Sequence, residues 1–185
     1  MERKQHPDRR IQRTRLALRE ALIDLMTERG WDETNIRDLC ERANVGRSTF
    51  YQHFQSKEEL LVGSFDDLRI WLTSHAVEYG NRSSPMPFVR GLIEHVQEQR
   101  ALFHRVIGRR SGHVVQKRFR EIVIKMVKES GAIQNTGWQL DATASYIAGA
   151  LVELLAWWVD SGTEQSVEEI EEHFFALTTV IYPQR

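Results

Sequence analysis

Eight consecutive residues in the first third of the chain carry side chains that could bind a polyanion. They read Arg47-Ser48-Thr49-Phe50-Tyr51-Gln52-His53-Phe54. Phe50 and Phe54 lie four positions apart and so share one face of a helix, and every other side chain in the run can form hydrogen bonds. An ordinary surface helix would usually carry Asp or Glu, which phosphate repels, but this run has neither. The residue types therefore suit contacts with the bases and phosphates of DNA.

Two short helices joined by a tight turn are expected to position these side chains. The first begins at Thr34 or Asn35, either of which can cap it, and ends near Ala43. Asn44-Val45-Gly46 then forms the turn, because Asn and Gly tolerate a left-handed backbone. The second helix follows from Arg47 to Phe54. Both rest on an apolar helix that ends at Gly30, an arrangement that predicts a helix-turn-helix with its second helix in the major groove.

A long helix is expected to open at Ser56, with Lys57 at its start. There the lysine charge and the N–H groups of the first turn could hold a phosphate. The charge distribution points the same way, since residues 1–57 hold twelve Lys and Arg against nine Asp and Glu. Seven of those basic residues lie among the first nineteen, against Glu2 and Asp8. A basic end on a mildly acidic body suggests that one end touches a polyanion.

The rest of the sequence is helical in pattern. Apolar residues recur at helical spacing over about 86–98, 99–108, 113–130, 140–161 and 166–181, and no alternating run bounded by hairpin turns predicts a strand. The prediction is an all-α chain of about nine helices. With 185 residues it can hold one large or two small domains, and its single cysteine, Cys40, excludes a disulfide framework. The basic amino terminus is no signal peptide, and the longest apolar run, Ile147–Val159, is too short to span a bilayer. We therefore expect a cytoplasmic protein that does not associate with membranes.

The stretch from Thr34 to Leu61, with its STFYQHFQSKEELL end, resembles the DNA-binding domain of the tetracycline-repressor (TetR) family of bacterial regulators. The resemblance covers roughly residues 10–70, which leaves 71–185 for a second domain. Cys40 stands where a small Ala is common in the family, and Asn44 where Gly is common. Both replacements are physically compatible, because Cys behaves as a small buried residue and Asn can adopt the left-handed conformation.

The resemblance implies specific roles. Base contacts are implied for Arg47, Ser48, Thr49 and Gln52, and phosphate contacts for Thr34, Asn35, Tyr51, His53 and Lys57. Thr34 or Asn35 could instead only cap a helix, and Tyr51 could simply pack. The resemblance also implies that the carboxy-terminal domain forms a homodimer and binds a small-molecule effector, with a double-stranded DNA operator as the main partner.

The helix expected over 140–161 is apolar nearly all round, which indicates cover by both its own core and a second subunit. With the last helix it would supply two helices to a four-helix dimer interface, although two ordinary core helices are the alternative. The expected interface residues are Leu151, Leu154, Trp158, Ile170, Phe174 and Leu177.

An effector pocket could be lined by aromatic and apolar residues of the central helices, with His95 or His104 as polar anchor, although such residues also suit a plain core. The candidate pocket residues are Phe88, Phe103, His104, Ile107, Phe119, Trp138 and Tyr146. The histidines show no HxxxH or HExxH spacing, so neither a metal site nor a cofactor is expected.

These observations favour a ligand-responsive repressor that binds a palindromic operator as a dimer. The alternative is an enzyme with a helical catalytic domain and a basic amino-terminal arm. Against an enzyme, the sequence has no GxSxG, no glycine-rich phosphate loop and no metal-ligand spacing. A DNA-packaging protein would have no reason to place Arg47 and Gln52 at base-facing positions.

Overall fold

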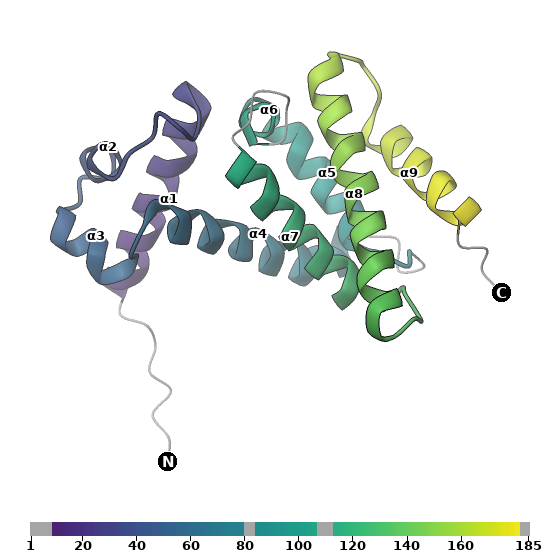
Figure 1. The fold of residues 1–185 in the computed structure, drawn as a ribbon. Coiled ribbons are helices and arrows are strands. Elements are labelled where there is room, and N and C mark those ends of the chain that lie inside the picture. The colour runs from purple at the N-terminus through teal and green to yellow at the C-terminus, as the bar shows by residue number, and fades with distance from the viewer. Residues whose placement is uncertain (1–8, 80–83, 107–112, 182–185) are drawn as a thin grey trace. The chain divides into compact units, whose positions relative to one another are not determined.

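The computed structural model describes residues 9–79, 84–106 and 113–181, and in these ranges it is built from helices alone (Figure 1). The described residues form nine helices and no strand, which confirms the all-α prediction. In chain order the helices are α1 (Arg9–Arg29), α2 (Ile36–Arg42), α3 (Arg47–His53), α4 (Lys57–Tyr79), α5 (Phe88–Glu98), α6 (Arg100–Val106), α7 (His113–Glu129), α8 (Gly137–Ser161) and α9 (Val167–Ile181).

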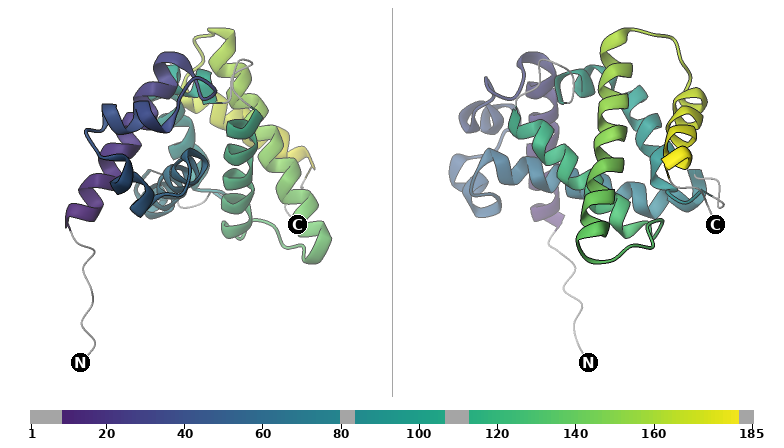
Figure 2. Two further views of the ribbon diagram at one scale, coloured as in Figure 1. Left: turned by 60° about the vertical axis from the view of Figure 1, so that its left-hand side comes forward. Right: turned by 45° about the vertical axis from the view of Figure 1, so that its right-hand side comes forward.

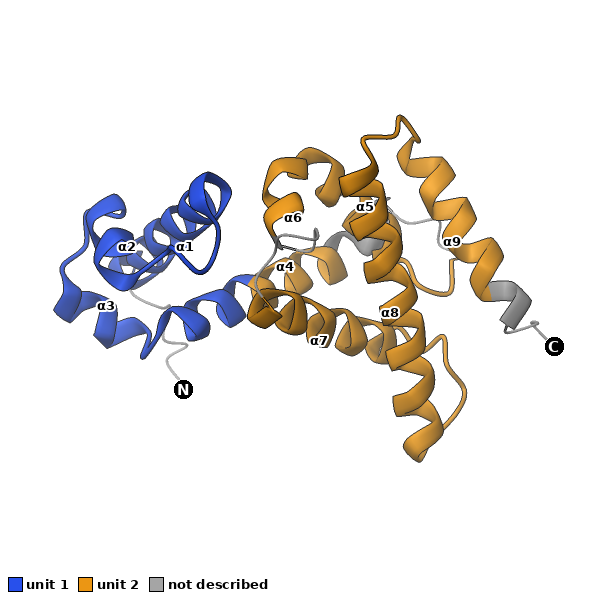
Figure 3. Ribbon diagram, turned by 45° about the horizontal axis from the view of Figure 1, so that its top comes forward, with its two compact units in different colours: residues 1–64 blue, residues 65–185 orange. Residues whose placement is uncertain are grey.

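The chain divides into two compact units, residues 1–64 and residues 65–185 (Figure 3). The division lies within α4, which gives its first two turns to the amino-terminal unit and the remainder to the carboxy-terminal unit. The boundary expected from the sequence, between residues 70 and 71, falls later in the same helix. Each unit has its own buried core, so each is described by itself.

The amino-terminal unit packs α1, α2, α3 and the start of α4 around a small core of residues with 0–1% exposure. Its centre is formed by Leu18, Leu22, Leu39, Phe50 and Leu60. Helix α1 ends at Gly30, whose φ of 86° only glycine adopts easily, and the Gly30 N–H donates to the Met26 carbonyl at 3.0 Å. The hydroxyl of Ser56 accepts a hydrogen bond from the Glu59 N–H at 3.2 Å and so caps α4, as expected.

In the carboxy-terminal unit α8 packs against α6, α7 and α9, and α5 packs along α9 (Figure 2). Arg90 connects α5 to α9: its guanidinium donates to Glu171 of α9 at 3.0 Å and also pairs with Glu168. Arg100 of α6 donates to the carbonyls of Trp158 and Val159, near the end of α8, where carbonyls lack helical partners.

Helix α8 has 25 residues and by length and composition is the one helix among the described residues that could cross a membrane. This differs from the sequence analysis, which considered only the apolar run Ile147–Val159. Eight of its side chains, including Leu151, Leu155 and Trp158, are buried within the unit. Packing against three other helices is the environment of a core helix.

Candidate nucleic-acid interface

Helix α3 presents two exposed rows of polar side chains, one half-buried polar row and one buried apolar row. Because residues four apart share a helix face, the rows are Arg47 with Tyr51, Ser48 with Gln52, and Thr49 with His53. Phe50 forms the buried row with Phe54, the residue that follows α3, and the two side chains are 0% and 2% exposed. The Ser48–Gln52 row therefore points away from the core, with the other two rows on its flanks.

The buried row holds α3 in place. The ring of Phe50 lies 6.0 Å from that of Phe54, and the guanidinium of Arg15 on α1 stacks 5.1 Å from the Phe54 ring. A helix of seven residues is not stable alone in water, so this packing keeps α3 helical. Tyr51 and His53 add to that packing, with ring centres 5.4 Å from Phe50 and 6.5 Å from Phe54. The Ser48–Gln52 row takes no part in it and is available for a ligand.

The turn between α2 and α3 takes the geometry expected from its residues. Asn44 has a φ of 50°, in the left-handed region that Asn tolerates. The Val45 N–H then donates to the Cys40 carbonyl at 2.9 Å, and Gly46 begins α3 with an extended backbone. Helices α2 and α3 with this turn form the expected helix-turn-helix, and α3 is the helix that a major groove would receive.

A hollow lies on each flank of α3. One, of about 630 Å³, is lined by Arg47 and by residues of α2 and the turn, including Arg37 and Glu41. Burial raises the pKa of the Cys40 thiol in its wall, so that thiol is neutral and unreactive. The other hollow, of about 530 Å³, is lined by Thr49, Gln52 and His53 together with four residues of α1, namely Arg10, Ile11, Thr14 and Arg15.

An exposed polar row between two arginine-lined flanks is an arrangement that can bind DNA. A helix inserted into a major groove directs its outward row at base edges, while its flanks face the two phosphate strands that border the groove. Ser48 and Gln52 are exposed polar side chains in the outward row. Arginines line both flanking hollows. The sequence analysis noted the excess of basic residues near the amino terminus but did not assign Arg10 or Arg15 to the interface.

Thr34 and Asn35 serve the fold in this structure. Thr34 is 1% exposed and its hydroxyl donates to the Gly30 carbonyl at 2.8 Å, so this side chain faces away from any ligand. Asn35 caps α2 by accepting a hydrogen bond from the Asp38 N–H at 3.1 Å. Asn35 thus matches the capping alternative of the sequence analysis and remains exposed, whereas the Thr34 hydroxyl is bound to a carbonyl just after α1 and does not cap α2.

Lys57 is half-buried, and its ammonium is bound to main-chain carbonyls. Its position at the start of α4 did not predict these contacts. Its ammonium donates to the carbonyls of Trp31 at 3.0 Å and Thr34 at 2.9 Å, and lies 4.2 Å from the centre of the Trp31 ring. An ammonium has three N–H donors, so one remains for a phosphate.

The candidate pocket residues of the carboxy-terminal unit do not form one group. Phe103 contacts Phe119 and His95, with ring centres 5.6 Å apart in each pair. Trp71 lies 5.9 Å from His95, and Phe65 lies 5.7 Å from Phe119. We call these five residues the aromatic cluster. Burial lowers the pKa of His95, so its imidazole is neutral near pH 7 and offers one donor and one acceptor.

The other candidate pocket residues lie elsewhere. Phe88 is buried at the start of α5, and His104 lies 3.4 Å from Asp160. Trp138 and Tyr146 are 73% and 58% exposed, so neither lines an enclosed pocket in this chain. Ile107 lies outside the described residues.

Four of the six expected interface residues are buried inside the unit itself. Leu151, Trp158, Ile170 and Phe174 are at most 2% exposed and belong to its core. Leu154 is half-buried and Leu177 is 54% exposed. The sequence pattern identified two strongly apolar helices but could not separate their inner from their outer faces.

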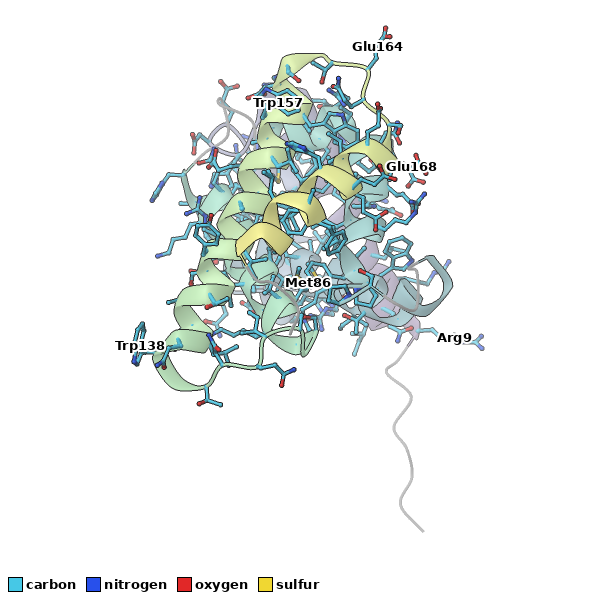
Figure 4. The ribbon with its side chains drawn as sticks, turned by 90° about the vertical axis from the view of Figure 1, so that its right-hand side faces the viewer. Arg9, Met86, Trp138, Trp157, Glu164 and Glu168 are labelled. Atoms are coloured by element: carbon cyan, nitrogen blue, oxygen red, sulfur yellow. The ribbon has the colours of Figure 1, made fainter. Side chains whose placement is uncertain are left out.

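The outward side of α8 carries a different set of side chains. Tyr146, Ala150 and Trp157 follow one another at spacings of four and seven, and Leu154 lies beside them. Trp157 is 51% exposed, and Figure 4 shows it and Trp138 near opposite ends of α8. We call Tyr146, Ala150, Leu154 and Trp157 the outer α8 face. In the described residues no group of three or more His, Cys, Asp or Glu side chains could hold a metal ion.

Known families match both parts of the chain. Residues 18–63 match the family described as bacterial regulatory proteins, tetR family, and residues 83–179, more than half of the chain, match a transcriptional regulator C-terminal region. The regulator YxbF of Bacillus subtilis is 41% identical over 61 residues, 32% of this chain but 16% of YxbF. The dhaKLM operon activator DhaS of Lactococcus lactis is 24% identical over 135 residues, 72% of this chain and 71% of DhaS.

Solved structures share the fold over most of the chain. A TetR transcriptional regulator from Streptococcus agalactiae is 25% identical, with a TM-score of 0.68 over 92% of this chain and 96% of that one. RolR, solved with resorcinol, is 20% identical (TM-score 0.58; 95% and 90% covered). Thermus thermophilus FadR, solved with lauroyl-CoA, is 17% identical (TM-score 0.57; 92% and 96% covered).

Proposed function

Because this chain belongs to the TetR family and is a DNA-binding transcriptional regulator, we propose that it acts in the cytoplasm as a homodimeric repressor released by a small ligand. Its operator is a palindrome, since two copies related by a two-fold axis present the same recognition helix to two half-sites. A repressor needs only to occupy DNA that polymerase must use. DhaS is named as an activator. The test below therefore also asks whether this protein represses or activates transcription.

The observation that carries this proposal is the outward row of α3. Neither Ser48 nor Gln52 is held by a hydrogen bond to another described residue, and both are exposed beside flanks lined with arginine. Gln pairs well with adenine, and Arg47 on the flank suits either guanine or phosphate. Such a surface has no role in the core of the unit.

The outer α8 face supports the dimer. Tyr146 and Trp157 are more than half exposed, and Leu177 of the adjacent α9 adds a further exposed apolar side chain. Soluble proteins seldom leave such a surface in contact with water. A second copy with the same surface would cover both faces at once.

The aromatic cluster supports a small aromatic effector. Flat rings around a neutral imidazole suit a ligand with one apolar face and one hydroxyl or carbonyl group. RolR was solved with such a ligand, resorcinol, whereas FadR was solved with an acyl-CoA. A ligand that prefers one arrangement of the carboxy-terminal unit would act on DNA affinity through α4, which contributes to both units.

The test compares Gln52→Ala with the wild-type dimer on an operator obtained by selecting DNA fragments with the purified protein. We expect a loss of about 1–3 kcal/mol per half-site and a changed base preference at one position. Gln97→Ala, the same change at an exposed residue of α5, is the matched control. Loss of affinity that is equal on specific and random DNA would contradict base contact by Gln52. A reporter behind the operator gives the sign of regulation.

A further inference from the structure

The first half of α1 carries an excess of positive charge that helix formation does not explain. Residues 9–19 contain five arginines and no acidic residue, and the first carboxylate of α1 is that of Glu20. Basic side chains at the amino-terminal end of a helix interact unfavourably with the helix dipole. The dipole therefore gives no reason for arginines at this end, and Arg9, Arg10 and Arg13 are exposed. Such a departure from local preference is typical of a binding surface.

The same part of α1 forms one wall of the hollow beside the Thr49–His53 row. Arg10 and Arg15 line it from α1, and Gln52 and His53 line it from α3. Among the described residues that line this hollow the charged side chains are arginines, whereas Glu41 lines the hollow on the other flank, 2.8 Å from Arg37. The α1 side is therefore a basic flank of α3.

Arg15 is held toward this hollow by its stacking on Phe54. A guanidinium stacked over a ring keeps its N–H donors at its edge, and five such donors suit phosphate oxygens. The hollow is also continuous with the interface, because Gln52 belongs both to its lining and to the outward row.

We propose that the first two turns of α1 bind the phosphate strand that borders the major groove on the Thr49–His53 side of α3. Arg10 is the main contact and Arg15 the second. The inference rests on the proposed function, since it assumes α3 in the groove, and adds to it an anchor outside the helix-turn-helix. A phosphate contact strengthens binding to every sequence and sets the register of α3 without reading bases.

The experiment measures binding of the full dimer to its operator and to random DNA across a range of salt concentrations. Arg10→Gln should weaken both about equally and flatten the slope of log K against log salt by roughly one in each protomer, which is about two for the dimer. Arg10→Lys keeps the charge and should retain most of the affinity. Lys117→Gln removes one exposed positive charge from α7 and is the matched control, with binding near wild type.

Ethylation interference on wild-type protein locates the contact directly. Modified phosphates on one strand beside each half-site should block binding of wild type and lose their effect in Arg10→Gln. Binding of Arg10→Gln equal to wild type, or a changed base preference with an unchanged salt slope, would overturn the α1 anchor. If Gln52→Ala also bound all DNA as wild type does, the placing of α3 itself would be wrong, which separates the two failures.

Discussion

Lys57 links the start of α4 to the segment that follows α1 by donating hydrogen bonds to the carbonyls of Trp31 and Thr34. Its ammonium also lies over the Trp31 ring. These contacts fix the segment that leads into α2 and so the whole helix-turn-helix. This one side chain thereby helps to hold α2 and α3 in position. The third N–H of its ammonium remains for DNA.

Lys57→Ala should therefore act on stability as well as on binding. The Thr34 carbonyl loses its lysine partner, while the Trp31 carbonyl keeps the hydrogen bond from the Thr34 N–H. We expect the free energy of unfolding to fall by about 1–3 kcal/mol. Urea denaturation measures the change, with Lys117→Ala, at an exposed site, as control. An unfolding midpoint like that of wild type would show that water replaces the lysine without cost.

His95 gives the protein a pH dependence with a defined sign. Burial lowers its pKa below the ordinary value of 6.5, while the charge of Glu98 opposes the shift. The unfolded chain then binds a proton below about pH 6.5 that the folded chain does not, so this residue removes stability as the pH falls through that value. In thermal melts between pH 7.5 and 5, His95→Gln should lose less stability than wild type. Parallel curves would contradict a half-buried imidazole with a lowered pKa.

The residues that stand out in the sequence without any structure are those with no part in the core. Gln52 and Ser48 are conspicuous because a polar row free of acids has no structural purpose. Thr34 and Lys57 are different, because their partners are main-chain carbonyls brought near by the fold, and no spacing in the sequence reveals them. The phosphate role assigned to Thr34 came from the resemblance alone, and that of Lys57 also from its charge at the start of a helix.

Helix α8 has one face buried in its own unit and another apolar face that the single chain leaves exposed. One side of it is sealed against α6, α7 and α9, while the outer α8 face remains in water. Trp157→Glu would place a charge on that face and should convert a dimer of about twice 21.6 kDa into a monomer.

Analytical ultracentrifugation at low micromolar concentration measures that change, and Leu177→Glu on α9 should act in the same way. Val114→Glu puts the same charge on an exposed apolar site of α7 and should leave the dimer intact. A monomeric wild type would disprove the dimer, and a dimeric Trp157→Glu would move the interface elsewhere.

Helix positions were predictable because the apolar period is strong. The expected ranges 113–130 and 166–181 agree closely with α7 and α9. Which face of α8 is buried was not predictable, because a helix that is apolar on all sides shows no difference in sequence between a core face and an interface. Trp158 and Trp157 are adjacent and chemically alike, yet one is 1% exposed and the other 51%.

At the scale of the whole molecule, α4 is the element shared by the two units. If a ligand in the aromatic cluster weakens operator binding by some factor, bound operator must weaken ligand binding by the same factor. With resorcinol as probe, we expect a raised melting temperature and a lower affinity for the operator-bound protein than for the free protein, both lost in His95→Gln. Calorimetry with and without operator measures the factor. Equal affinities would mean that the site is not regulatory.

The exposed rows of α3 have a consequence for how such regulators diverge. Phe50 and Phe54 keep the helix folded, and the fold places no demand on the identity of Ser48 or Gln52. Exchange of the outward row can therefore change the preferred operator at almost no cost in stability, unlike most changes to a protein. A duplicated copy could acquire a separate set of target genes through one or two substitutions, while its dimer and its effector response stay as they were.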